Sequence, residues 1–109
     1  MVQSIGIIET CGTSAAIRAA DIMAKSAAVE VVGIGNVGGG RQSVVILGDT
    51  GAVQAAISAA LAELGNAPTA QVLGSHIIAR PEGAFSIESI LHTWIRADSL
   101  DDDANWLYD

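Results

Sequence analysis

The chain has 109 residues, half of them hydrophobic but only 4% aromatic, and a net charge of −7. With five basic residues against twelve acidic ones it lacks the positive surface that nucleic acid requires, so we expect no nucleic-acid partner. Its single cysteine, Cys11, excludes an internal disulfide framework and fits a reducing cytoplasm, and no signal peptide or membrane-spanning run is recognisable, so we expect no membrane partner.

The first half of the chain carries alternating strand and helix signals. Residues 2–9 are apolar and β-branched and predict a strand, and residues 12–27 predict a helix with Thr13 as its N-cap. Residues 29–35 predict a second strand, and residues 41–47 predict the strand that pairs back on it as a hairpin.

The second half repeats the helix and strand signals. Residues 48–65 predict a helix that is capped by Asp49 or Thr50 and ends at Gly65, and residues 70–79 predict a last strand. The order βαββαβ predicts an α+β fold, a ferredoxin-like sandwich with one antiparallel sheet and two helices on one of its faces. We place this domain at residues 1–85.

Residues 86–109 differ in character from the domain. Apolar residues recur there at helical spacing and predict a short amphipathic C-terminal helix that docks on the domain; they are Ile87, Ile90, Leu91, Trp94 and Ile95. The acidic end, "DDDANWLYD", is more typical of a flexible, solvated tail. The alternative is a peptide whose aromatic residues dock on a partner or a neighbouring subunit.

A glycine-rich stretch, "VVGIGNVGGG", occupies residues 31–40. It contains G-x-G-x-x-G at Gly33, Gly35 and Gly38, the spacing of a dinucleotide-binding turn. That turn leads from a strand into a helix, whereas a β-branched strand signal follows here, and Asp49 comes too early to bind a ribose. The dinucleotide interpretation fails, so the glycines need another explanation.

The ordered motifs carry a family resemblance. They are "GIIET-x-G" (6–12), "AADIMAKSA" (19–27), "VGIGNVGGGR" (32–41), "GD-x-GAV-x-A" (48–55) and "SHIIARP" (75–81). In this order and spacing they resemble the bacterial microcompartment shell domain over about residues 3 to 81. Arg41 and the "HIIARP" strand end are most similar to the hexameric shell proteins of cyanobacterial carboxysomes.

The resemblance implies a structural protein without cofactor or metal, located in a shell in the cytoplasm. Six copies would form a homohexamer, a flat disc that tiles with other shell proteins around encapsulated enzymes. Small side chains in the core agree with this, because burying further surface in an oligomer would add stability. The resemblance leaves open whether the chain mixes with related chains, and whether the compartment is a carboxysome or a metabolosome.

The same resemblance assigns the glycine loop to a pore on the sixfold axis that passes small anionic metabolites. Gly39 matches its narrowest position, and Asn36 stands where carboxysome relatives commonly have Lys, so we expect only a mildly positive pore. Arg41 would add positive potential if it turned toward the pore, or would be tied up between subunits. The matching residues are Asn36, Val37, Gly38, Gly39, Gly40 and Arg41.

Two cations match the edge where neighbouring hexamers meet. Lys25 corresponds to the family's edge lysine, and Arg80 to the arginine after the last strand. Without the resemblance, Lys25 would be interpreted as a solvated residue that favours the helix dipole.

Two other functions compete with a shell role. An enzyme would have to use Cys11 as nucleophile with His76 and Glu9, and a lone Cys and His on separate strands are more often structural. A small-molecule-binding regulatory module is the other alternative, because ferredoxin-like folds host many such domains.

Overall fold

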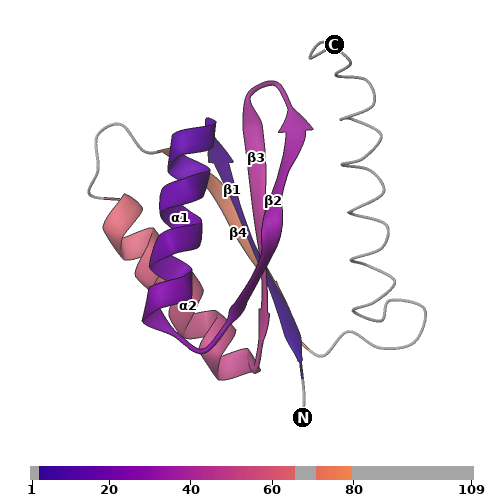
Figure 1. Ribbon diagram of the computed structural model, residues 1–109, viewed down its shortest axis with the longest axis vertical. Helices are drawn as coiled ribbons and strands as arrows, with labels where there is room; N and C mark the ends of the chain where they lie inside the picture. Colours follow the sequence, from indigo (N-terminus) through magenta and orange to yellow (C-terminus); the bar gives the residue numbers. More distant parts are fainter. Residues whose placement is uncertain (1–2, 66–70, 80–109) are drawn as a thin grey trace, which may run out of the picture.

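The computed structural model describes residues 3–65 and 71–79 and contains a βαββαβ unit. Its four strands form one sheet in the order β2-β3-β1-β4, with every neighbouring pair antiparallel, and both helices cover the same face of that sheet (Figure 1). The predicted α+β class and element order are confirmed. The elements are β1 (Ser4–Cys11), α1 (Thr13–Ser26), β2 (Glu30–Gly38), β3 (Arg41–Gly48), α2 (Thr50–Leu64) and β4 (Gln71–Ile78).

The start of α1 differs from the prediction. Thr13 is the first helical residue, and the N-cap position belongs to Gly12, which makes no side-chain cap. Gly12 has a φ of +90°, a backbone conformation that favours glycine, because the chain turns there from β1 directly into α1. The hydroxyl of Thr10 donates to the carbonyl of Gly12 at 3.2 Å and supports this turn. Thr13 was therefore the wrong capping residue.

The start of α2 lies where the sequence predicts it. Asp49 is the N-cap residue, but its side chain makes no capping hydrogen bond. Thr50 is the first helical residue, and its hydroxyl forms a hydrogen bond of 2.6 Å with the hydroxyl of Ser4 on β1. This bond ties the start of α2 to the sheet. Gly65 is the C-cap residue, as predicted, with an ordinary helical φ of −63°.

The core lies between the sheet and the two helices and consists of small and branched aliphatic side chains. Alternate residues of β3 point into it, and the helices contribute chiefly alanines. Because alanine is short, the helices lie close to the strands. None of the described helices is long and apolar enough to cross a membrane. The fully buried side chains include Ile8, Ala16, Ala19, Met23, Val44, Ile46, Val53, Ala56 and Ala60.

Gly6 shows how closely the layers approach. A Cβ added to it would lie 2.7 Å from a methyl carbon of Val53 on α2 and 2.9 Å from a side-chain carbon of Ile46 on β3. These distances are shorter than real Cβ contacts, so any larger residue at position 6 would force the neighbouring side chains to move. The residues predicted to form a C-terminal helix and tail, and Arg80, lie outside the described residues.

We therefore expect Gly6→Ala to lower the free energy of unfolding by about 1–3 kcal/mol through overpacking. Gly74→Ala is the matched control, because a Cβ at Gly74 meets nothing within 4 Å. Urea denaturation at a fixed protein concentration measures both. A Gly6→Ala variant as stable as the parent would contradict the close packing of α2 on β1.

Candidate functional site

The connection between β2 and β3 is a turn of two residues, Gly39 and Gly40. Their φ angles are +63° and +79°, and Gly38 before them has +91°. Two-residue hairpins favour turns with positive φ at both central residues, and glycine adopts these angles without steric cost. The glycine run is therefore explained by the turn, and no helix follows it.

The turn is shorter than the predicted loop. Residues 36–40 were expected to form it, but β2 continues to Gly38. Asn36 pairs with Gln42, and Gly38 pairs with Arg41, with a register shift between the two pairs. Ladder pairing therefore extends almost to the tip of the hairpin and leaves only two residues for the reversal.

Three hydrogen bonds hold the hairpin end in shape. The Asn36 side-chain oxygen accepts from the amide of Gly38 at 2.9 Å, and Arg41 Nε donates to the carbonyl of Gly38 at 3.4 Å. The amide of Gly12 donates to the carbonyl of Gly40 at 2.7 Å and joins the turn to the start of α1. The hairpin tip is thus fixed to the body of the domain.

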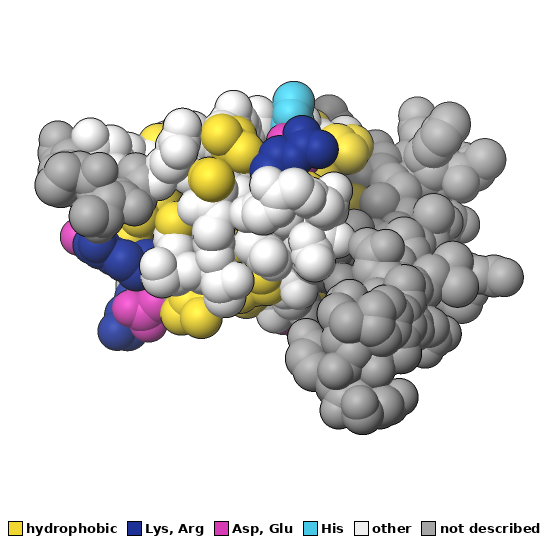
Figure 2. All heavy atoms as spheres, turned by 90° about the horizontal axis from the view of Figure 1, so that it is seen from above, with side chains coloured by type: hydrophobic (Ala, Val, Ile, Leu, Met, Phe, Trp, Pro, Cys, Tyr) yellow, Lys and Arg dark blue, Asp and Glu magenta, His cyan; other side chains and the backbone are white. Residues whose placement is uncertain are grey.

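The hairpin tip is open to its surroundings. All six residues from 36 to 41 are exposed, and a Cβ at any of the three glycines would meet nothing within 4 Å. Seen from this end, the described surface is mostly uncharged, and its few basic and acidic side chains lie near one another toward its margins (Figure 2). Within residues 36–41 the one charged side chain is the guanidinium of Arg41, and much of the rest is exposed backbone.

Lys25 lies at the opposite end of the domain. Helix α1 starts beside Gly40 and runs away from the turn, so its last turn, with Lys25, lies at the far end (Figure 1). The Lys25 ammonium forms an ion pair of 3.0 Å with Asp21 one helical turn earlier, and both side chains are largely exposed. Strand β4 also ends there, since Ile78 pairs with Ile5. Arg80 follows two residues later, outside the described residues.

A groove beside Lys25 was not predicted from the sequence. It has a volume of about 600 Å³ and lies between α1 and α2, where the outer positions of α2 hold the short side chains Ala59 and Ala62. Asp21 and Glu63 give it acidic walls. Small residues at helical spacing on the exposed side of α2 were the signal that could have indicated it.

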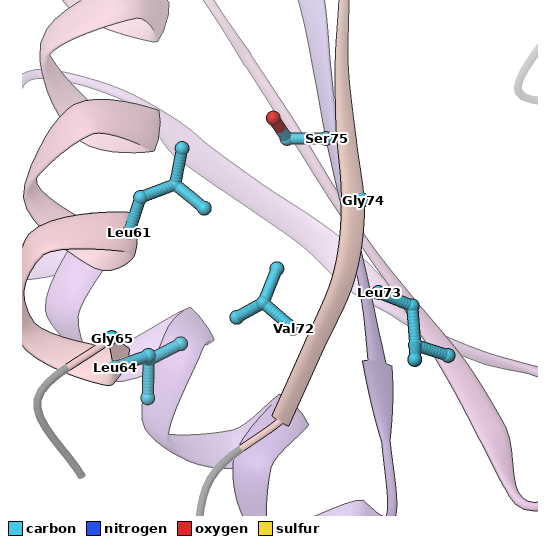
Figure 3. A pocket seen from close by; sticks show the side chains of 7 residues that line it. All are labelled: Leu61, Leu64, Gly65, Val72, Leu73, Gly74 and Ser75. Carbon is cyan, nitrogen blue, oxygen red and sulfur yellow. The ribbon is translucent and has the colours of Figure 1, made fainter.

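A second hollow, of about 300 Å³, lies between the end of α2 and strand β4 (Figure 3). Leu61 and Leu64 of α2 and Val72 of β4 face one another across it, whereas Leu73 points to the other side of the strand (Figure 3). Its polar side chain is the hydroxyl of Ser75. Because β4 is an edge strand, this hollow lies at the margin of the sheet.

The structure does not assemble the residues of the enzyme hypothesis into a site. In the strand ladder Glu9 lies opposite Gly74, His76 lies opposite Ile7, and Cys11 lies at the end of β1 opposite Gln71. Among the described residues no hydrogen bond links the three side chains, and no group of three His, Cys, Asp or Glu residues that could hold a metal ion occurs.

The chain belongs to the BMC domain family, whose model matches residues 4–81. It is 45% identical over 78 residues to the carboxysome shell protein CcmK2 of Synechococcus elongatus, covering 72% of this chain and 76% of that protein. It is 43% identical over 89 residues to the bacterial microcompartment shell protein PduA of Salmonella typhimurium, covering 82% of this chain and 90% of that one.

A solved structure agrees with this assignment. The crystal structure of a microcompartment protein from Desulfitobacterium hafniense matches with a TM-score of 0.66 and 30% identity over 75% of this chain. The match covers 43% of that longer protein. The predicted family is thus confirmed, and the named relatives are structural shell proteins and not enzymes.

The geometry of the turn gives a prediction for its glycines. Gly39→Ala should lower the free energy of unfolding by about 1–2 kcal/mol, because a residue with a Cβ is strained at a φ of +63°. Gly51→Ala, in the first turn of α2 with open space around it and an ordinary φ, should be neutral or raise stability by up to about 1 kcal/mol. Urea denaturation compares them, and equal effects would contradict the positive φ at Gly39.

Proposed function

We propose that this protein is a structural shell protein of a bacterial microcompartment of the carboxysome kind, forming homohexamers that tile with other shell proteins. Its location would be the shell of that compartment in the cytoplasm. The observation that supports it best is the placement of two features at opposite ends of the domain: the exposed glycine turn at one end and Lys25 at the other. The strand order β2-β3-β1-β4 supports the finer description as a ferredoxin-like sandwich.

The glycine turn suits the axis of a hexamer. Six copies of one hairpin converging on an axis leave little room for side chains, and residues 38–40 have none. Their exposed backbone amides provide partial positive charge toward a passing anion. Arg41 is held to the carbonyl of Gly38 on the same hairpin, and Asn36 adds no charge. We therefore propose a polar, mildly positive pore for small anionic metabolites.

Lys25 suits the outer edge of the tile. Its ion pair with Asp21 is exposed, and such pairs contribute only about 0.3–0.5 kcal/mol, so exchanging this partner for carbonyl oxygens of a neighbouring tile costs little. An ammonium group has three donors, of which Asp21 takes one. Strand β4 ends at the same end of the domain, which brings the chain there just before Arg80.

The margin of the sheet suits a contact between subunits. Edge strand β4 exposes Leu73 and Ile77, and Leu61 of α2 is exposed beside the hollow between α2 and β4. Exposed apolar side chains grouped along an edge strand are typical of surfaces that pair with another chain. The alternative, a small-molecule-binding regulatory module, is less well supported, because the hydroxyl of Ser75 is the one polar side chain that lines this hollow.

Assembly tests the proposal directly. Native mass spectrometry should show a hexamer, and electron microscopy should show sheets or tubes of the purified protein or of its co-assembly with other shell proteins. Lys25→Ala should abolish the sheets and leave the hexamer intact, because the acceptors across the edge lose their donor. Arg18→Ala, which removes another exposed cation of α1, is the control and should leave both unchanged. A monomer would contradict the proposed hexamer, and sheets that persist in Lys25→Ala would contradict the edge role of Lys25.

The pore assignment predicts that Gly39→Trp closes the axis. The φ of Gly39 lies near the left-handed helical value, so a side chain is tolerated at a cost of about 1–2 kcal/mol. Cryo-electron microscopy of the hexamer should show aromatic density on the axis, and growth that depends on the compartment should slow where this tile forms the shell.

Ser58→Trp, which places the same ring on the exposed side of α2, should leave the axis open and growth unchanged. A hexamer whose axis lies away from residues 36–41 would contradict the assignment.

A further inference from the structure

The described domain has two flanks, one at each edge of the sheet. Helix α1 contacts edge strand β2, and helix α2 contacts edge strand β4. Each flank therefore combines one helix with one edge strand, and they are the α1/β2 flank and the α2/β4 flank. The two flanks expose different shapes.

The α1/β2 flank carries a protruding apolar side chain. Ile17 is 56% exposed, more than any other large hydrophobic side chain of the described residues. Ser26 lines the groove toward α2, and Ile17 precedes it by nine residues, about two and a half helical turns, so Ile17 points away from α2. Thr13 and Ala24 lie on the same side of α1 as Ile17, and both are exposed and uncharged.

The α2/β4 flank carries a hollow. It is the one of about 300 Å³ across which Leu61, Leu64 and Val72 face one another (Figure 3). None of the residues that line it is charged. Gln54, two helical turns before Leu61 on the same side of α2, is also exposed and uncharged.

The protruding side chain and the hollow lie at the same end of the domain. Helix α1 begins beside Gly40 of the glycine turn, and Ile17 lies in its second turn. Val72 lines the hollow and pairs with Thr10, close to the end of β1 that leads into α1. Both features are therefore near the glycine turn, on opposite flanks.

The partner that fits this arrangement is a second copy of the chain. A side chain on one flank and a hollow on the opposite flank cannot meet within one subunit, but they meet between copies placed head to tail. The two surfaces also match in charge, because neither carries an ionised group that the contact would have to strip of water. Head-to-tail contacts that repeat around an axis close into a ring.

We propose that Ile17 of each subunit fills the hollow between α2 and β4 of the next subunit. This contact presupposes the proposed hexamer and assigns the side chains that hold its neighbouring subunits together. Because both features lie near the glycine turn, the contact brings the turns of adjacent subunits toward one centre.

A carboxylate placed on either side of the contact tests it. Ile17→Asp and Leu61→Asp should each keep the circular dichroism of the parent, because both positions are exposed in the subunit. Each should dissociate at protein concentrations at least about tenfold higher than the parent does, because the contact would bury an unpaired charge. Native mass spectrometry and sedimentation over a dilution series measure this.

Mixing the two variants tests which surfaces meet. Ile17→Asp retains an intact hollow, and Leu61→Asp retains an intact Ile17, so one parental contact can form between one chain of each. An equimolar mixture should therefore contain a heterodimer of the two chains at concentrations where each variant alone is monomeric. The heterodimer should not grow into a ring, because its outer surfaces both carry the added carboxylate.

Ala55→Asp is the matched control. Ala55 is exposed on α2 one turn before Ala59, which lines the groove toward α1, so it lies away from the hollow. The added carboxylate should leave the hexamer unchanged there. Should an aspartate variant fail to fold, Ile17→Ala and Leu61→Ala remove apolar contact without adding charge, and both should shift dissociation in the same direction by a smaller factor.

The outcomes separate this contact from the hexamer on which it depends. A parent chain that is monomeric would contradict the hexamer and the contact together. A hexameric parent whose Ile17 and Leu61 variants remain equally hexameric would overturn the contact alone. A mixture that stays monomeric, or an Ala55→Asp variant that dissociates like the others, would also overturn it.

Discussion

The hydrogen bond from the amide of Gly12 to the carbonyl of Gly40 connects the glycine turn to the start of the helix that carries Lys25. It joins the tip of the β2–β3 hairpin to the point where β1 turns into α1. Helix α1 begins beside this bond and runs away from the turn, so Lys25 in its last turn lies at the other end of the domain. A glycine is needed on each side of it, since both residues have positive φ.

Small side chains determine how the layers pack. Alanines on both helices and Gly6 on β1 bring the helices close to the sheet, and the resulting core contains no aromatic residue among those described. Such a core buries little apolar area per residue. Burying further surface between subunits would therefore add to the stability of the fold. The exposed apolar side chains along β4 lie where a neighbouring chain could cover them.

The glycines of β2 and of the turn have different physical causes. Gly38, Gly39 and Gly40 satisfy a backbone requirement, because the two-residue reversal needs positive φ. Gly33 and Gly35 lie within the β2–β3 ladder and are not among the glycines with positive φ, so the turn does not account for them. One stretch of sequence therefore combines glycines of an edge strand with a tight turn, which the G-x-G-x-x-G spacing alone would misassign to nucleotide binding.

The sequence by itself determined the order of the six elements, the hairpin, the region where α2 begins and the family, because apolar periodicity, turn residues and motifs are local properties of the chain. The tertiary structure decided what depends on residues far apart. It showed that Asn36 and Gly38 belong to β2, because their partners lie on β3, and that Gly12 replaces Thr13 at the start of α1. It also placed the turn and Lys25 at opposite ends, because the direction of a helix relative to a sheet follows from packing and not from either sequence segment alone.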